Sequence, residues 1–190
     1  DALLVCLRED LPKAFENESY RDEVEKIRLR FEDRQSEVFT TVQQKAQAQG
    51  YTILRTAAGL DIAPLVDGQV MTPEMFQQLP AERQRAIDKE TQALNAELED
   101  AYYQIRLFET DTRAGIDALN RQVAETTLAH TFAHLRQQYQ AEKEVLTYPE
   151  ELYKDILDNV ADFLPNEEHE GELDLRRYTV NLLVDNSQTS

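Results

Sequence analysis

Apolar side chains recur every three or four positions along most of the chain, which is the spacing of one face of an α-helix. The first such stretch spans 2–16, and we expect Pro12 to interrupt its regular hydrogen bonding. The second spans 19–49, with Ser19 as the candidate N-cap and Gly50 as the candidate C-terminal residue. Its apolar positions follow a seven-residue repeat, which predicts coiled-coil packing. These positions are Val24, Ile27, Phe31, Val38, Val42 and Ala46.

The pattern changes to an alternation of apolar and polar residues between 51 and 70, which indicates β-strands. Turn sequences at 57–59 and 67–68 separate the alternating runs and predict a β-hairpin. Pro64 cannot donate a hydrogen bond to a neighbouring strand, so we expect it at an edge of the sheet. Thr72-Pro73 then predicts the N-cap and first residue of a short helix.

Helical spacing resumes from about 81 to 140, with a possible bend between Thr110 and Gly115. The part from 81 to 110 is about as long as 19–49 at ~1.5 Å per residue. Because the hairpin between them reverses the chain, we expect the two helices to lie antiparallel. The predicted fold is mainly α: an elongated antiparallel helical bundle or coiled-coil arm with a small β-hairpin at its tip.

The domain organisation predicted from these elements is one helical module followed by a short acidic tail. A strand-like run at 178–184 closes the chain, and a lone strand cannot satisfy its own hydrogen bonds. We therefore expect both ends to continue into a larger fold. The predicted parts are a module at 1–165, with an arm at 19–110, its hairpin tip at 51–70 and a helical base at 1–18 and 111–165, and an acidic loop and terminal strand at 166–190.

The net charge of the chain limits the classes of partner that we expect it to bind. It has 37 acidic and 20 basic residues, a net charge of −17. Such a field repels phosphate backbones and anionic lipids, so we expect neither a nucleic-acid nor a membrane partner. No apolar run reaches the ~18 residues that a membrane span requires. The single cysteine, Cys6, cannot form an internal disulfide and is typical of a reduced, cytoplasmic protein.

Patterns that carry catalytic or metal chemistry are weak. His130 and His134 could reach one metal ion from a helix, but no third ligand is indicated by spacing. No serine lies in a nucleophile-elbow sequence, and no glycine-rich loop could hold a phosphate. Tyr102, Tyr103 and Phe108 fall on the apolar stripe, where we expect core packing. We predict no catalytic residue, no cofactor site and no metal site in this chain.

The remaining candidate is the concentration of apolar side chains around the hairpin. One face of a hairpin can pack on the helix ends, which leaves the other face pointing away. The set either closes a small core or stays partly exposed and contacts other proteins, for which methionines are well suited. The predicted interaction residues are Ile53, Leu60, Ile62, Val66, Met71 and Met75.

An ordered series of segments runs through nearly the whole chain. They are Leu11–Phe15, Arg34-Gln35, Leu54–Leu60, Ala63–Gly68, Met71–Phe76, Leu79-Pro80 and Arg177–Asn186. Together they resemble the helical insert of bacterial Lon-like ATP-dependent proteases. In that family a divergent AAA+ module precedes a Lon-type peptidase domain with a Ser–Lys dyad. The order and spacing of the segments carry the resemblance, since no single motif is chemically specific.

The resemblance implies that the parent protein is an ATP-dependent serine endopeptidase, a homo-hexameric ring that uses ATP and Mg²⁺. The phosphate-binding loop and the dyad of that family lie outside this sequence, so no catalytic residue is carried over. The implied role is a non-catalytic arm that handles or recognises unfolded or misfolded protein, or contacts neighbouring subunits. Its other implied partners are the AAA+ and peptidase domains of the same chain, which 181–186 would rejoin. The alternative is a purely structural coiled-coil spacer or oligomerisation element.

Overall fold

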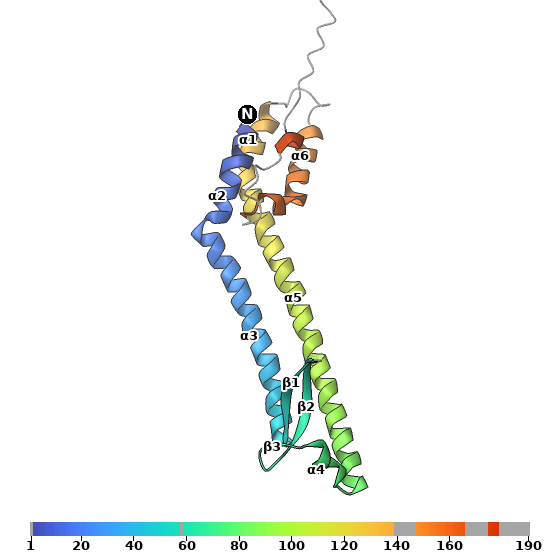
Figure 1. The fold of residues 1–190 in the computed structure, drawn as a ribbon. Helices are drawn as coiled ribbons and strands as arrows, with labels where there is room; N and C mark the ends of the chain where they lie inside the picture. Colours follow the sequence, from blue (N-terminus) through green and yellow to red (C-terminus); the bar gives the residue numbers. More distant parts are fainter. Residues whose placement is uncertain (1, 58, 139–146, 166–174, 179–190) are drawn as a thin grey trace, which may run out of the picture. The chain divides into compact units, whose positions relative to one another are not determined.

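The computed structural model describes residues 2–57, 59–138, 147–165 and 175–178. Most of them are helical, and a small three-stranded antiparallel sheet accompanies the helices (Figure 1), which confirms the predicted mainly-α class with a β-hairpin. The chain divides into two compact units, unit 1 at 1–26 with 115–190 and unit 2 at 27–114. The elements are α1 (Ala2–Val5), the π-helical turn η1 (Cys6–Asp10), α2 (Leu11–Glu16), α3 (Glu18–Ala48), β1 (Tyr51–Thr56), β2 (Gly59–Val66), β3 (Gln69–Val70), α4 (Pro73–Gln77), α5 (Ala81–Gln138), α6 (Thr147–Asp158) and the 3₁₀ turns η2 (Val160–Phe163) and η3 (Leu175–Tyr178).

The first helical segments change geometry just before Pro12. A proline inside a helix has no N–H for the carbonyl four residues earlier, and its ring crowds that carbonyl. The backbone here widens into the π-helical turn η1, in which the Leu11 N–H donates to the Cys6 carbonyl five residues back. The predicted interruption near Pro12 is therefore confirmed, and it takes the form of a π-turn.

Unit 1 has a core formed by α1, η1, α2, the C-terminal part of α5, and α6 with the turns around it. The Phe132 ring meets Tyr153 edge-on, with centroids 4.9 Å apart. Asn120 is 6% exposed, and its side-chain oxygen accepts the Tyr20 hydroxyl at 2.7 Å. That hydrogen bond offsets the cost of burying the amide. The innermost side chains of this core are Leu7, Leu11, Phe15, Leu128, Phe132, Ile156 and Phe163.

Helix α3 is capped by Asn17 and not by Ser19, which corrects the predicted N-cap. The Asn17 side-chain oxygen accepts the Ser19 N–H at 3.0 Å, and its carbonyl accepts the Arg21 N–H at 3.1 Å. Asn and Ser are about equally good caps, so propensity does not separate them. At the other end, Gly50 has φ +81° and donates to the Gln47 carbonyl, which confirms the predicted C-terminal glycine.

Helix α5 is continuous from Ala81 to Gln138, through the segment between Thr110 and Gly115 where we expected a bend. The Thr110 hydroxyl bonds back to the Arg106 carbonyl at 3.0 Å, which lets a turn-favouring residue fit inside the helix. At the C-terminal end of the chain, Tyr178 lies in the 3₁₀ turn η3. The rest of the strand-like run and the acidic loop at 166–172 lie outside the described residues.

The sheet lies in unit 2 with the strand order β1-β2-β3. β1 and β2 are antiparallel and pair from Tyr51 opposite Pro64 to Thr56 opposite Gly59. A two-residue turn, Asp67-Gly68, leads into β3, with φ values of +51° and +79°. Two successive positive φ angles are typical of the type I′ turn that favours Asp-Gly. The hairpin and its second turn are therefore confirmed.

Pro64 lies in the central strand β2, which contradicts the predicted edge position. Its carbonyl accepts the Met71 N–H at 2.9 Å, so its nitrogen points to the same side. Because that nitrogen carries no hydrogen, the return bond to Met71 cannot form, and the pairing with β3 ends at Val70. The proline is tolerated here because it stands where the third strand ends.

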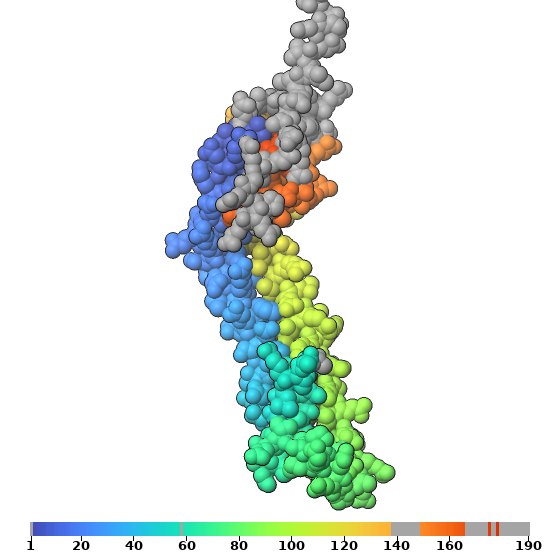
Figure 2. Space-filling model, in the orientation of Figure 1, coloured from blue at the N-terminus to red at the C-terminus, as the bar shows by residue number. Residues whose placement is uncertain are grey.

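We expected one face of the hairpin to pack on the helix ends, and the hairpin packs on α3 and α5 of unit 2. In Figure 2 its side chains (teal) lie in front of α3 and α5. Tyr51 reaches Glu90 of α5 through a hydrogen bond of 2.6 Å, which fixes the start of β1 against that helix. The core that joins the three elements consists of Val42 and Ala46 of α3, Tyr51 and Ile62 of the sheet, and Leu94, Leu98 and Ala101 of α5.

The Tyr51 hydroxyl makes the stability of unit 2 depend on pH in the alkaline range. Burial and the hydrogen bond to Glu90 raise the pKa of Tyr51 to about 12 from an ordinary value of 10.0. A phenol whose pKa is higher in the folded state stabilises fully below pH ~10 and loses this contribution as pH rises through ~12. We expect the free energy of unfolding to fall over that range by up to about 2–3 kcal/mol more than in a Tyr51→Phe variant. Urea titrations at fixed pH measure this, and identical pH profiles for the two proteins would contradict it.

Candidate interaction surface

The structure divides the six predicted tip residues between core and surface. Ile62 is 4% exposed, and Ile53 and Leu60 are partly buried against the same core. Ile53 stands opposite Ile62 in the sheet, so both point to the face that packs on Leu94 and Leu98. The expectation that Ile62 is available for contacts is therefore wrong, because this face of the hairpin is the covered one.

The other three predicted residues lie closer to solvent. Val66 and Met71 are half-buried, and Met75 on α4 is 40% exposed. Val70, which the sequence did not single out, is 39% exposed in the short strand β3. The exposed part of the predicted set is therefore concentrated at the β3–α4 end of the sheet.

Helix α4 holds Met75 in place although it has only five residues. The Thr72 side chain accepts the Met75 N–H at 3.3 Å, which confirms the predicted N-cap. At its other end, the Gln84 amide donates to the carbonyls of Phe76, Gln77 and Leu79 at 2.9–3.3 Å. A side chain of α5 thus satisfies carbonyls that a helix end otherwise leaves to water.

The outer face of the sheet carries a second set of half-exposed apolar residues. Leu54, Ala63 and Leu65 alternate with the buried positions of β1 and β2, so they point away from the core. The sequence prediction did not include them. Both faces of these strands are apolar, so periodicity alone does not indicate which one the helices cover.

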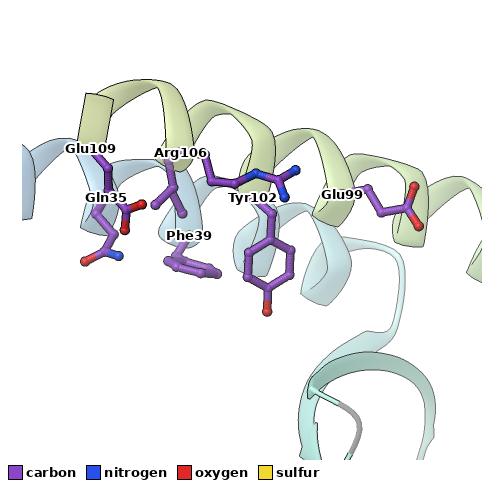
Figure 3. Close-up of a pocket in the computed structure, with 7 residues that line it drawn as sticks. Gln35, Phe39, Glu99, Tyr102, Arg106 and Glu109 are labelled. Atoms are coloured by element: carbon purple, nitrogen blue, oxygen red, sulfur yellow. The ribbon is translucent and has the colours of Figure 1, made fainter. Parts of the chain in front are cut away.

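A shallow hollow of about 530 Å³ lies between α3 and α5 within unit 2 (Figure 3). Phe39 of α3 and Tyr102 of α5 meet edge-on there, with ring centroids 5.9 Å apart and an interplanar angle of 87°. Charged side chains of α5, those of Glu99, Arg106 and Glu109, line the same hollow. Its wall therefore combines two aromatic rings with charges of both signs.

Two further side chains of α5 extend the exposed apolar surface of unit 2. Tyr103 is 57% and Leu107 46% exposed, and residues four apart lie on one face of a helix. Tyr102 is 37% exposed, so the predicted core location of the two tyrosines is wrong. Phe108 is partly buried, with the Arg34 guanidinium 5.3 Å from its ring centroid. We call Tyr102, Tyr103 and Leu107 the aromatic stripe.

The residues with metal-binding or nucleophilic chemistry do not come together as one site in the described part of the chain. Among the described residues, no group of three or more His, Cys, Asp or Glu side chains could hold a metal ion. His130 and His134 are both exposed on α5. Cys6 is buried, and burial raises the pKa of its thiol, which disfavours the nucleophilic thiolate. None of the helices in the described part of the chain has the length and apolar character to cross a membrane.

A comparison with models of known protein families finds no match for this chain, and a search of curated proteins finds no similar sequence. The resemblance to Lon-like proteases thus stays a prediction from the sequence segments quoted above. The physical argument for function comes from unit 2, where large apolar side chains face solvent at Tyr102 in the hollow, at Tyr103 and Leu107 of α5, and at the β3–α4 end of the sheet.

Proposed function

We propose that this chain is the non-catalytic helical arm of a cytoplasmic Lon-like ATP-dependent serine protease, where it contacts unfolded or misfolded protein. ATP, Mg²⁺ and the catalytic dyad would belong to the AAA+ and peptidase domains of the parent, which we propose to be a homo-hexamer. The observation that carries the contact role is the set of large apolar side chains that unit 2 leaves exposed. They are Leu29, Val70, Met75, Tyr102, Tyr103 and Leu107.

The chemistry of these residues suits a partner without a fixed structure. Tyr103 and Leu107 lie four residues apart on one face of α5, and neighbouring exposed apolar side chains are what a contact site offers. Methionine and tyrosine adapt to partners of varied shape, the first through flexibility and the second through its polar hydroxyl. Glu99 and Glu109 beside the hollow would keep such a surface hydrated when no partner is bound.

We further propose that α3 and α5 form an antiparallel coiled-coil arm. The support is the seven-residue spacing of the apolar positions of α3 and the joint core in which Val42 of α3 packs with Leu94 and Leu98 of α5. Lys45 of α3 also forms an ion pair with Glu97 of α5. A rigid arm would hold the exposed apolar surface at a fixed place on the parent ring.

The second candidate is a structural spacer without contacts to substrate. The observation that favours it is α5 itself, a single helix of 58 residues. A helix of this kind, such as its stretch in unit 2 that packs on α3, acts as a spacer along its own axis and needs no exposed apolar surface to do so. The two candidates differ in what they require of the aromatic stripe.

The test replaces Tyr103 and Leu107 together by aspartate in the full-length protease. Breakdown of an unfolded protein is measured and divided by the cleavage rate of a short peptide. We expect this ratio to fall several-fold, because charged side chains do not retain an apolar segment. The matched control carries the same two charges at Gln92 and Gln104, which are exposed polar positions of α5. If the stripe variant keeps the wild-type ratio, the spacer function is favoured and the contact role is refuted.

A further inference from the structure

Hydrogen bonds in the hairpin fix which backbone groups point outward. The Leu65 N–H donates to the Gly50 carbonyl at 2.7 Å, which makes these two a hydrogen-bonded pair. In an antiparallel ladder such pairs alternate with pairs whose N–H and C=O groups point away from each other. By this alternation, the backbone N–H and C=O groups of Ile53 and Arg55 in β1 and of Ile62 in β2 point away from the partner strand. The Ile62 N–H indeed donates to a side chain and not to β1.

The outer edge of β2 offers few donors to a further strand. The Asp61 carboxylate accepts the Ile62 N–H at 2.8 Å, so this donor is already occupied. Pro64 has no N–H, and β3 covers the two residues Leu65 and Val66. Occupied donors, a proline and a short covering strand are the features that prevent a sheet edge from pairing with another chain.

The outer edge of β1 has none of these features. β1 ends the sheet on that side in the part of the chain that the structure describes. Its six residues contain no proline, and Arg55 is its one charged residue. Thr52, Ile53 and Leu54 are half-buried, while Arg55 is exposed, so the strand is accessible towards its turn. The outward N–H groups of Ile53 and Arg55 belong to alternate residues, which is the spacing at which an added extended strand can accept hydrogen bonds from β1.

We propose that the free edge of β1 binds an extended segment of client polypeptide as an added strand of the sheet. This inference rests on the proposed function and adds the conformation in which the client is held. Main-chain hydrogen bonds are the same for every sequence, so they suit clients that share only an unfolded backbone. Leu54 on the outer face would contact alternate side chains of the added strand, which favours apolar clients.

The experiment measures peptide binding to the 190-residue chain by fluorescence anisotropy. The probe is a labelled ten-residue peptide of alternating Val and Thr with a terminal Lys. Its partner probe has the same side chains but carries N-methyl groups on alternate amides, which removes the donors on one edge of the strand. We expect the N-methylated peptide to bind at least tenfold more weakly, because side chains alone cannot replace the main-chain bonds.

The matched variants are Arg55→Pro and Arg55→Ala. Both remove the exposed side chain, and only proline removes the outward N–H. We expect Arg55→Pro to weaken binding of the unmethylated peptide several-fold and Arg55→Ala to leave it near the wild-type value. Circular dichroism and thermal unfolding show whether the proline variant is folded. Should it fail to fold, the comparison of the two peptides on the wild-type chain decides the question.

Separate outcomes test the inference and the proposed function. Equal affinities for the two peptides, or for the two Arg55 variants, would overturn strand addition. If an unfolded protein still binds and the change at Tyr103 and Leu107 abolishes that binding, the contact function stands without strand addition. A wild-type chain that binds neither unfolded protein nor peptide refutes the proposed function itself. A wild-type dimer that Arg55→Pro dissociates in sedimentation would assign the edge to a second copy and overturn the client proposal.

Discussion

Replacing Ile62 by aspartate is expected to destabilise unit 2 by about 4 kcal/mol or more, a large part of the stability of an ordinary domain. The Ile62 side chain is 4% exposed and lies in a core of apolar side chains and Tyr51. A carboxylate there would lose its hydration without gaining a cationic partner, and the apolar contacts with Leu94 and Leu98 would be lost as well. Urea denaturation followed by circular dichroism measures the change.

The matched control for this substitution is Val70→Asp. Val70 is also an apolar residue of the sheet, but it is 39% exposed in β3. A new charge at that position keeps most of its hydration, so we expect a change within about 0.5 kcal/mol. If the two aspartate variants prove equally stable, the packing of the hairpin against α5 is not as described.

In unit 1, Phe132→Ala is expected to cost about 3–5 kcal/mol. The Phe132 side chain has 0% exposure, and its ring contacts Tyr153 edge-on in the core. Alanine would leave a cavity that the neighbouring helices can fill only partly. Phe132→Leu retains most of the volume and should cost clearly less, while His134→Ala, on the exposed side of the same helix, should change stability by less than about 0.5 kcal/mol. Equal stabilities for the three variants would contradict the assignment of Phe132 to the core.

The hairpin was predictable because its signals are local. Asp67-Gly68 favours a two-residue turn, and Thr72 followed by Pro73 favours a helix start, whatever the rest of the chain does. The covered face of the hairpin was not predictable in this way. Ile53 and Leu54 are adjacent and about equally apolar, so only packing on α5 decides which one faces the core. Hydrophobic alternation gives a strand, and tertiary contacts give its orientation.

The exposed aromatic residues show a similar limit on α5. The spacing of apolar residues does not separate adjacent positions on a helix. The sequence therefore places Tyr102 and Tyr103 on the same apolar stripe as Ala101 and Ile105. The buried positions turn out to be Ala101 and Ile105, with 2% and 5% exposure. Small Ala101 takes the place against the neighbouring elements, and the larger tyrosines remain outside. The size of the side chain decides which of these residues is buried at the contact, and hydrophobic periodicity carries no information on size.

The two edges of the sheet also limit how far any self-association can proceed. Fibrils grow because each added strand offers a new free edge on its far side. In this hairpin Asp61 occupies the Ile62 N–H and Pro64 has no N–H, so between its turn and β3 the far side of β2 keeps the Leu60 N–H alone as an outward donor. Growth beyond a pair of molecules is therefore disfavoured. The hairpin is thus a poor template for polymer growth, whichever chain pairs with the edge of β1.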